Sequence, residues 1–68
     1  MTAKEMFEEL GYEKNYHIAY VMYYNKEEDY YIWFFKDTKT IEVRFDIDMK
    51  LLKAINKQCE ELGWLGDK

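Results

Sequence analysis

The chain has 68 residues, a formal net charge of -4, one cysteine, one histidine and no proline. A chain of this length forms one small domain, taken here as residues 1–68, and buries only a small core. A single thiol cannot form an internal disulfide, so the class of disulfide-stabilised secreted mini-proteins is excluded.

Charged residues occur along the whole sequence, and the first ten residues carry Lys4 and three glutamates. Such a segment lacks the apolar centre of a secretory signal peptide. The longest stretch free of Asp, Glu, Lys and Arg runs from Asn15 to Asn25, and its 11 residues are too few to cross a bilayer as a helix. We therefore expect a cytoplasmic protein without a membrane segment.

Residues 2–10 have the pattern of a short amphipathic helix. Thr2 and Glu5 have the spacing of a capping box, in which each side chain accepts a hydrogen bond from the other residue's amide. The apolar stripe at helical spacing consists of Ala3, Met6, Phe7 and Leu10. Gly11 follows directly and predicts the end of the helix, because glycine adopts the left-handed conformation without strain.

The middle third of the chain predicts three β-strands, at residues 16–24, 30–35 and 40–45. The first two are rich in aromatic and β-branched residues, and the polar segment 25–29 separates them as a loop. The third alternates apolar and polar residues, as expected of a half-buried strand. Because the loops are short, neighbouring strands must pair antiparallel, which gives a three-stranded meander.

The turn after the second strand sets the register of the third. A two-residue turn that pairs Lys36 with Lys39 places Phe34 opposite Ile41. The same register also pairs Ile32 with Val43 and Tyr30 with Phe45. A turn one residue longer would move the third strand's apolar residues to the other face.

Residues 48–62 predict a second amphipathic helix, with Asp48 as its N-terminal cap. Its expected buried face consists of Leu51, Leu52, Ile55, Cys59 and Leu62. The pattern Glu-Glu-Leu-Gly-aromatic ends both helices, at 8–12 and 60–64, and we interpret it as one stop signal used twice. The order α-β-β-β-α predicts an α+β two-layer sandwich with both helices on one face of the sheet.

Aromatic residues are concentrated in the sheet, where nine of the thirteen lie between Tyr16 and Phe35. Strand 30–35 carries apolar side chains on both faces, and two helices can cover only one of them. An aromatic patch therefore remains, for which the candidate interface residues are Tyr23, Tyr31, Trp33 and Phe35. Such patches are typical of protein interfaces, so we expect a homodimer that stacks two sheets or pairs edge strands.

Two other binding functions remain open. Aromatic sheets can stack the bases of single-stranded nucleic acid, but 10 basic residues against 14 acidic ones make nucleic acid an unfavourable partner. The acidic segment Glu27, Glu28 and Asp29, with the glutamate pairs at 8–9 and 60–61, could instead imitate a phosphate backbone. A protein of that kind would inhibit a nucleic-acid-binding or defence protein by occupying its basic groove.

The sequence contains no pattern that predicts catalysis, a metal site or a cofactor. Cys59 lies on the apolar face of the second helix and is expected to be a core residue, because its surroundings disfavour the thiolate. The lone His17 has no partner that would make it a general base. The chain has no serine, no Gly-rich phosphate loop and no set of zinc or calcium ligands. We therefore expect a non-enzymatic protein.

The segments Met6-Phe7-Glu8-Glu9-Leu10-Gly11-Tyr12 and Leu51 through Trp64, with the Tyr-rich hairpin between them, carry a resemblance. In these features the chain resembles small uncharacterised proteins encoded by phages and prophages of Gram-positive bacteria. The resemblance implies an intracellular accessory protein that acts by binding another protein of the host or phage. It implies no catalytic residues.

Overall fold

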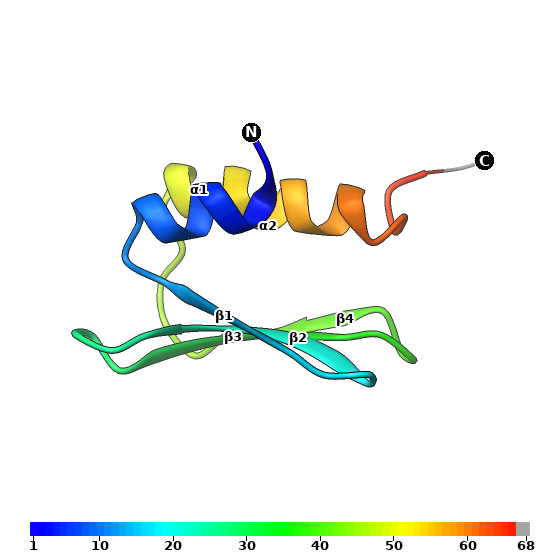
Figure 1. Cartoon of the computed structure of the whole chain (residues 1–68), viewed down its shortest axis with the longest axis horizontal. Helices are drawn as coiled ribbons and strands as arrows, with labels where there is room; N and C mark the ends of the chain where they lie inside the picture. Colours follow the sequence, from blue (N-terminus) through cyan, green and yellow to red (C-terminus); the bar gives the residue numbers. More distant parts are fainter. Residues whose placement is uncertain (67–68) are drawn as a thin grey trace.

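The computed structural model describes residues 1–66. Its elements are α1 (Ala3–Glu9), β1 (Glu13–Tyr16), β2 (Tyr20–Asn25), β3 (Tyr30–Phe35), β4 (Thr40–Glu42) and α2 (Met49–Glu61). The strands form one antiparallel sheet in the order β1-β2-β3-β4. Both helices lie on the same side of this sheet, which leaves its other face without a covering layer (Figure 1). The protein is therefore of the α+β class.

The sheet has four strands, and the prediction of a three-stranded meander was wrong. The segment 16–24, predicted as one strand, contains a chain reversal at residues 17–20. The His17 amide donates to the Tyr20 carbonyl (2.9 Å), and the Tyr20 amide donates to the His17 carbonyl (3.3 Å). His17 Nδ1 also accepts a hydrogen bond from the Ala19 amide (3.1 Å). This turn escaped prediction because it contains none of the glycine, proline, asparagine or aspartate residues that usually mark turns.

Of the two registers left open for the last two strands, the structure has the one in which Phe34 lies opposite Ile41. The connection is nevertheless longer than the predicted two-residue turn, because the pairing stops at Phe35 and Thr40 and leaves a four-residue loop. Lys39 takes a left-handed conformation at the end of this loop (φ 55). The faces of these strands are therefore those of the register with Lys36 opposite Lys39, although the loop is longer than two residues.

β4 is shorter than the predicted strand 40–45, because the chain leaves the sheet after Glu42. The predicted neighbour of Tyr30, Phe45, still lies beside it, and the two rings stack with centroids 4.0 Å apart. Phe45 makes this contact from the segment that rises toward α2. The half of β3 next to Tyr31 is therefore paired with β2 on one side and has no strand on its other side.

Three hydrogen bonds stabilise the N-terminus of α1. The predicted capping box is confirmed, because the Glu5 amide donates to Thr2 Oγ1 (3.2 Å) and the Thr2 amide donates to Glu5 Oε1 (2.8 Å). The Ala3 amide donates to Glu61 Oε2 (2.8 Å), which comes from the end of α2. A negative side chain at this position satisfies a free helix amide and complements the helix dipole. Glu61 of α2 therefore acts as a cap for α1.

The two helices end in the same way, as the repeated stop signal predicts. Gly11 and Gly63 have left-handed conformations, with φ angles of 94° and 80°. The next residue in each case donates its amide to the carbonyl five residues earlier, at 3.0 Å for Tyr12 and 2.9 Å for Trp64. Both ends are thus Schellman motifs, in which glycine avoids the strain of a Cβ atom.

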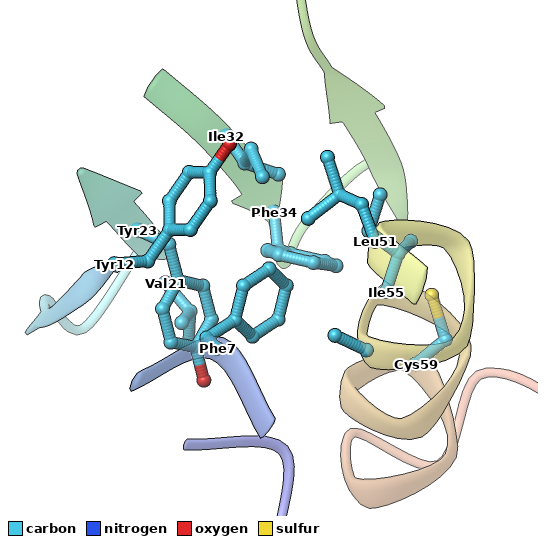
Figure 2. Close-up of a cluster of buried hydrophobic side chains, with 10 residues drawn as sticks. Phe7, Tyr12, Val21, Tyr23, Ile32, Phe34, Leu51, Ile55 and Cys59 are labelled. Atoms are coloured by element: carbon cyan, nitrogen blue, oxygen red, sulfur yellow. The ribbon is translucent and has the colours of Figure 1, made fainter. Parts of the chain in front are cut away.

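The core lies between the helices and the near face of the sheet (Figure 2). Phe7 of α1 stacks on Tyr23 of β2 with ring centroids 3.7 Å apart, and meets Phe34 and Tyr12 edge to face. From α2, the buried residues are Leu51, Ala54, Ile55, Gln58 and Cys59. The prediction that Leu52 is buried was wrong, because it lies beyond the contact stripe and is 37% exposed.

Candidate interface on the outer face of the sheet

We call the face turned away from the helices the outer face. Side chains alternate along a strand, and directly opposed residues of paired strands share a face. Val21, Tyr23, Ile32 and Phe34 are buried toward the helices. The residues between them, which we call the apolar block, are Tyr20, Met22, Tyr24, Tyr31, Trp33 and Phe35.

The rings of the apolar block contact one another across and along the strands. Trp33 lies nearly parallel to both ring neighbours on β3, with centroids 5.9 Å from Phe35 and 6.3 Å from Tyr31. From β2, Tyr24 lies 4.6 Å from Tyr31, and Tyr20 meets Trp33 edge to face at 5.1 Å. These contacts join side chains of the two central strands into one aromatic layer.

Polar residues flank this layer on both edge strands. On β1, Glu13 and Asn15 lie opposite Tyr24 and Met22, and on β4, Glu42 lies opposite Trp33. An apolar centre inside a polar rim is the usual distribution of residues in a protein interface. The outer face therefore has the composition of a binding surface.

A hollow of about 430 Å³ opens where β4 ends. Its lining residues are Asp29, Tyr30, Tyr31, Trp33, Glu42, Arg44 and Phe45. Inside it, the Arg44 guanidinium forms an ion pair with Glu42 (2.8 Å) while its own side chain stays largely exposed. The hollow therefore extends the outer face beyond the last strand and adds a positive charge to its rim.

The structure places three of the four predicted interface residues on the outer face. Tyr31 is 41% exposed, and Trp33 and Phe35 are half-buried. Tyr23 is fully buried under α1, so its prediction as an interface residue was wrong. The β2 members of the apolar block were not predicted. The alternation of buried and half-buried residues along β2 would identify Tyr20, Met22 and Tyr24, but only if the strand is known to begin at Tyr20.

The predicted acidic residues Glu27, Glu28 and Asp29 are exposed in the loop between β2 and β3. Asn25 Oδ1 accepts hydrogen bonds from the amides of Glu27 (3.0 Å) and Glu28 (3.1 Å), which orders the start of this loop. Asp29 closes the loop in a left-handed conformation (φ 58). The three carboxylates thus project at one end of the sheet.

The other acidic residues do not extend this group into a continuous row. Glu8 pairs with Lys4 (3.1 Å) and Glu60 pairs with Lys57 (2.9 Å), while Glu61 caps α1. Because Glu61 reaches the beginning of α1, the C-terminal ends of the two helices lie at opposite ends of the molecule. These acids serve local contacts in the helical layer.

The two residues considered for catalysis lie on different layers. Cys59 is buried in α2, and burial raises the pKa of its thiol, which disfavours the reactive thiolate. His17 lies in the exposed turn between β1 and β2, where its ring stacks on Tyr20 (4.6 Å). Within residues 1–66, no three His, Cys, Asp or Glu side chains are grouped so that they could hold a metal ion.

None of the helices that the structure describes combines the length and apolarity needed to cross a membrane. Comparison of the chain with protein-family models, with curated proteins and with solved structures gives no match.

Proposed function

We propose that this protein acts by binding another protein surface through the outer face, and that the first occupant of this face is a second copy of the chain. The observation that carries the proposal is the apolar block with its polar rim. Tyrosine and tryptophan are enriched at such interfaces because they combine a large apolar area with a polar group.

The size of the outer face sets the expected affinity. With ~3.3 Å per residue and ~4.8 Å per strand, the apolar block and its rim cover about 20 Å by 19 Å. An interface of this size belongs to the small class, which buries less than about 1,200 Å² in total. The proposed dimer should therefore dissociate on dilution, with a dissociation constant on the order of micromolar.

The charges on the rim favour a second copy over an unrelated occupant. Glu13 lies on one side of the apolar block, opposite Tyr24, and Arg44 lies on the other side, in the hollow that Tyr31 also lines. When two outer faces stack about a two-fold axis parallel to the strands, β1 of each copy lies over β4 of the other. Glu13 then faces Arg44 of the second copy twice, so the surface is complementary to itself.

The charges support this occupant better than nucleic acid or mimicry of it. The rim and the hollow contribute Glu13, Asp29 and Glu42 against the single cation Arg44, whereas a nucleic-acid surface needs surplus positive charge. An imitation of a phosphate backbone needs a continuous row of free carboxylates. Of the acids at the helix ends, Glu8 and Glu60 form ion pairs and Glu61 caps α1.

Sedimentation of matched variants tests the proposal. Tyr31→Lys places a charge in the apolar block and should lower the mass observed where the wild-type chain is associated. Leu52→Lys is the control, because Leu52 has a similar exposed fraction (37% against 41%) but lies on α2. It should leave the mass unchanged. Equal masses for the two variants, or a wild-type chain that stays monomeric at high micromolar concentration, would refute the proposal.

A further inference from the structure

The free edge of β1 carries backbone groups that point out of the sheet. His17 and Tyr20 exchange both of their backbone hydrogen bonds. Hydrogen-bonded and non-hydrogen-bonded pairs alternate along an antiparallel ladder, so the amide and carbonyl groups of Lys14 and Tyr16 point away from β2. Among residues 1–66, none of these four groups has a backbone or side-chain partner.

The edge of β1 is accessible, and its C-terminal end is apolar. Tyr16 is 72% exposed and Ile18, in the adjoining turn, is 85% exposed, although both are large hydrophobic residues. In Figure 1, β1 and the turn that follows it extend away from the helical layer. Of the usual protections of a free edge, β1 has a short length and the charged residues Glu13 and Lys14, but its described part has no proline, bulge or covering segment.

We propose that β1 pairs with β1 of a second copy, antiparallel and about a two-fold axis through Asn15. In this register, Lys14 of each copy lies opposite Tyr16 of the other, and the four outward groups of each copy form four hydrogen bonds in total. The two Asn15 residues face each other as a non-hydrogen-bonded pair. A two-fold axis is the only symmetry by which one strand edge can pair with an identical edge in a closed dimer.

Two neighbouring registers are less favourable. A shift toward the N-terminus would pair Tyr16 with Tyr12, whose amide already donates to the Phe7 carbonyl (3.0 Å). A shift in the other direction would pair Lys14 with Ile18, which belongs to the turn and is not extended. The register centred on Asn15 uses only residues of β1.

Side chains complement each other in the same register. On the outer face, Glu13 of each copy lies opposite His17 of the other, which places a carboxylate beside an imidazole. On the inner face, the Lys14 ammonium lies beside the Tyr16 ring, the type of contact that Lys36 already makes with this ring within one chain (4.1 Å). The product is one eight-stranded sheet in which two outer faces lie side by side. This contact uses the edge of β1 whereas the stacked dimer uses the apolar block, and Glu13 takes part in both.

A cysteine at the two-fold axis tests this arrangement directly. In a Cys59→Ala background, Asn15→Cys places two thiols on Cα atoms about 4.5 Å apart, within the range that a disulfide spans. In a glutathione redox buffer, this variant should form a covalent dimer at least about tenfold more readily than Lys14→Cys, its matched control one residue away. Intact-mass spectrometry measures both fractions.

A second substitution separates the edge contact from other association. Tyr16→Pro removes an outward amide and leaves the β1–β2 ladder intact, so it should abolish the Asn15→Cys disulfide while the circular dichroism spectrum is kept. Equal crosslinking of Asn15→Cys and Lys14→Cys would overturn the proposal, as would a stronger disulfide from Tyr16→Cys. Neither result would affect the sedimentation test of Tyr31→Lys, which reports on the outer face.

Discussion

Tyr23 and Gln58 form a hydrogen bond inside the core, where the tyrosine hydroxyl donates to Gln58 Oε1 at 2.5 Å. Tyr23 is on the central strand β2 and Gln58 is on α2, so the bond joins the two layers of the fold. It explains how a glutamine can lie fully buried on the apolar side of an amphipathic helix. Each polar group satisfies the other away from water.

This pair predicts a non-additive response to mutation. Gln58→Leu leaves the Tyr23 hydroxyl buried without an acceptor and should lower the free energy of unfolding by about 1–3 kcal/mol. Tyr23→Phe leaves the glutamine unpaired and should have a similar effect. The double variant removes both groups, so it should cost clearly less than the sum of the single changes in urea unfolding. Additive costs would show that the bond contributes nothing to stability.

The stability of the protein should decrease at alkaline pH. Burial, followed by the charges of Glu61 and Glu8, raises the pKa of Tyr23 above its ordinary value of 10.0. Below about pH 10 the residue is neutral in both states, so its contribution is complete. Above that pH the unfolded chain ionises first, and the free energy of unfolding falls with rising pH.

Replacement of single tyrosines identifies the group responsible for this fall. Tyr23→Phe should flatten the pH dependence of the urea midpoint above pH 10. Tyr16→Phe should not flatten it, because a hydrogen bond from Lys36 lowers the pKa of Tyr16 and gives the opposite sign. If both variants keep the wild-type slope, other groups control alkaline unfolding.

The cap that Glu61 provides for α1 distinguishes it from its neighbour Glu60. Glu61→Ala leaves the Ala3 amide without an acceptor and should cost about 1 kcal/mol, as loss of an N-terminal cap usually does. Glu60→Ala removes only a surface ion pair with Lys57 and should cost less. Hydrogen exchange at the Ala3 amide should accelerate in the first variant alone. Acceleration in both, or in neither, would contradict the assignment of the cap.

The rim charges predict a pairing pattern between variants. Glu13→Arg and Arg44→Glu should each weaken the face-to-face dimer, because like charges then meet at both contacts. An equimolar mixture of these two variants should associate again, because every contact in the mixed dimer joins opposite charges. Light scattering measures the mass of each variant and of the mixture. The salt concentration is about 0.15 M, because the Debye length is then about 8 Å and repulsion between the acidic loops is largely screened.

A mixture that stays as dissociated as its components would show that the axis is not parallel to the strands. The same conclusion would follow if Glu13→Arg, Arg44→Glu and their mixture all associated as strongly as the wild-type chain. In both cases Tyr31→Lys still decides whether the outer face is the interface.

The sequence predicted those features of the fold that depend on short-range patterns. Gly11 and Gly63 end the helices as expected because their motifs contain all the residues that form the bonds. The pairing of Phe34 with Ile41 is one of the two registers that the sequence left open, the one that follows when Lys36 lies opposite Lys39. The reversal after His17 was missed because its backbone and imidazole bonds form without the usual turn residues.

The candidate interface was predicted only in part, and the reason is the same turn. Tyr23 and Tyr24 are adjacent tyrosines, and only the register of β2 decides which of them is buried. With the start of β2 unknown, Tyr23 was assigned to the surface, whereas it stacks on Phe7 in the core. Tyr31, Trp33 and Phe35 share one face of β3 by alternation, and the register that pairs Phe34 with Ile41 is the one that turns this face away from the core.

The most direct test of the central claim, that the outer face binds a second copy, is a dilution series followed by NMR. The chain has two indole groups, and each provides one N–H signal: Trp33 lies in the apolar block, and Trp64 packs against the core beside Phe34. The proposal predicts that the Trp33 signal moves on dilution through the micromolar range while the Trp64 signal stays fixed. A Trp33 signal that does not move while the sedimenting mass falls would contradict the claim.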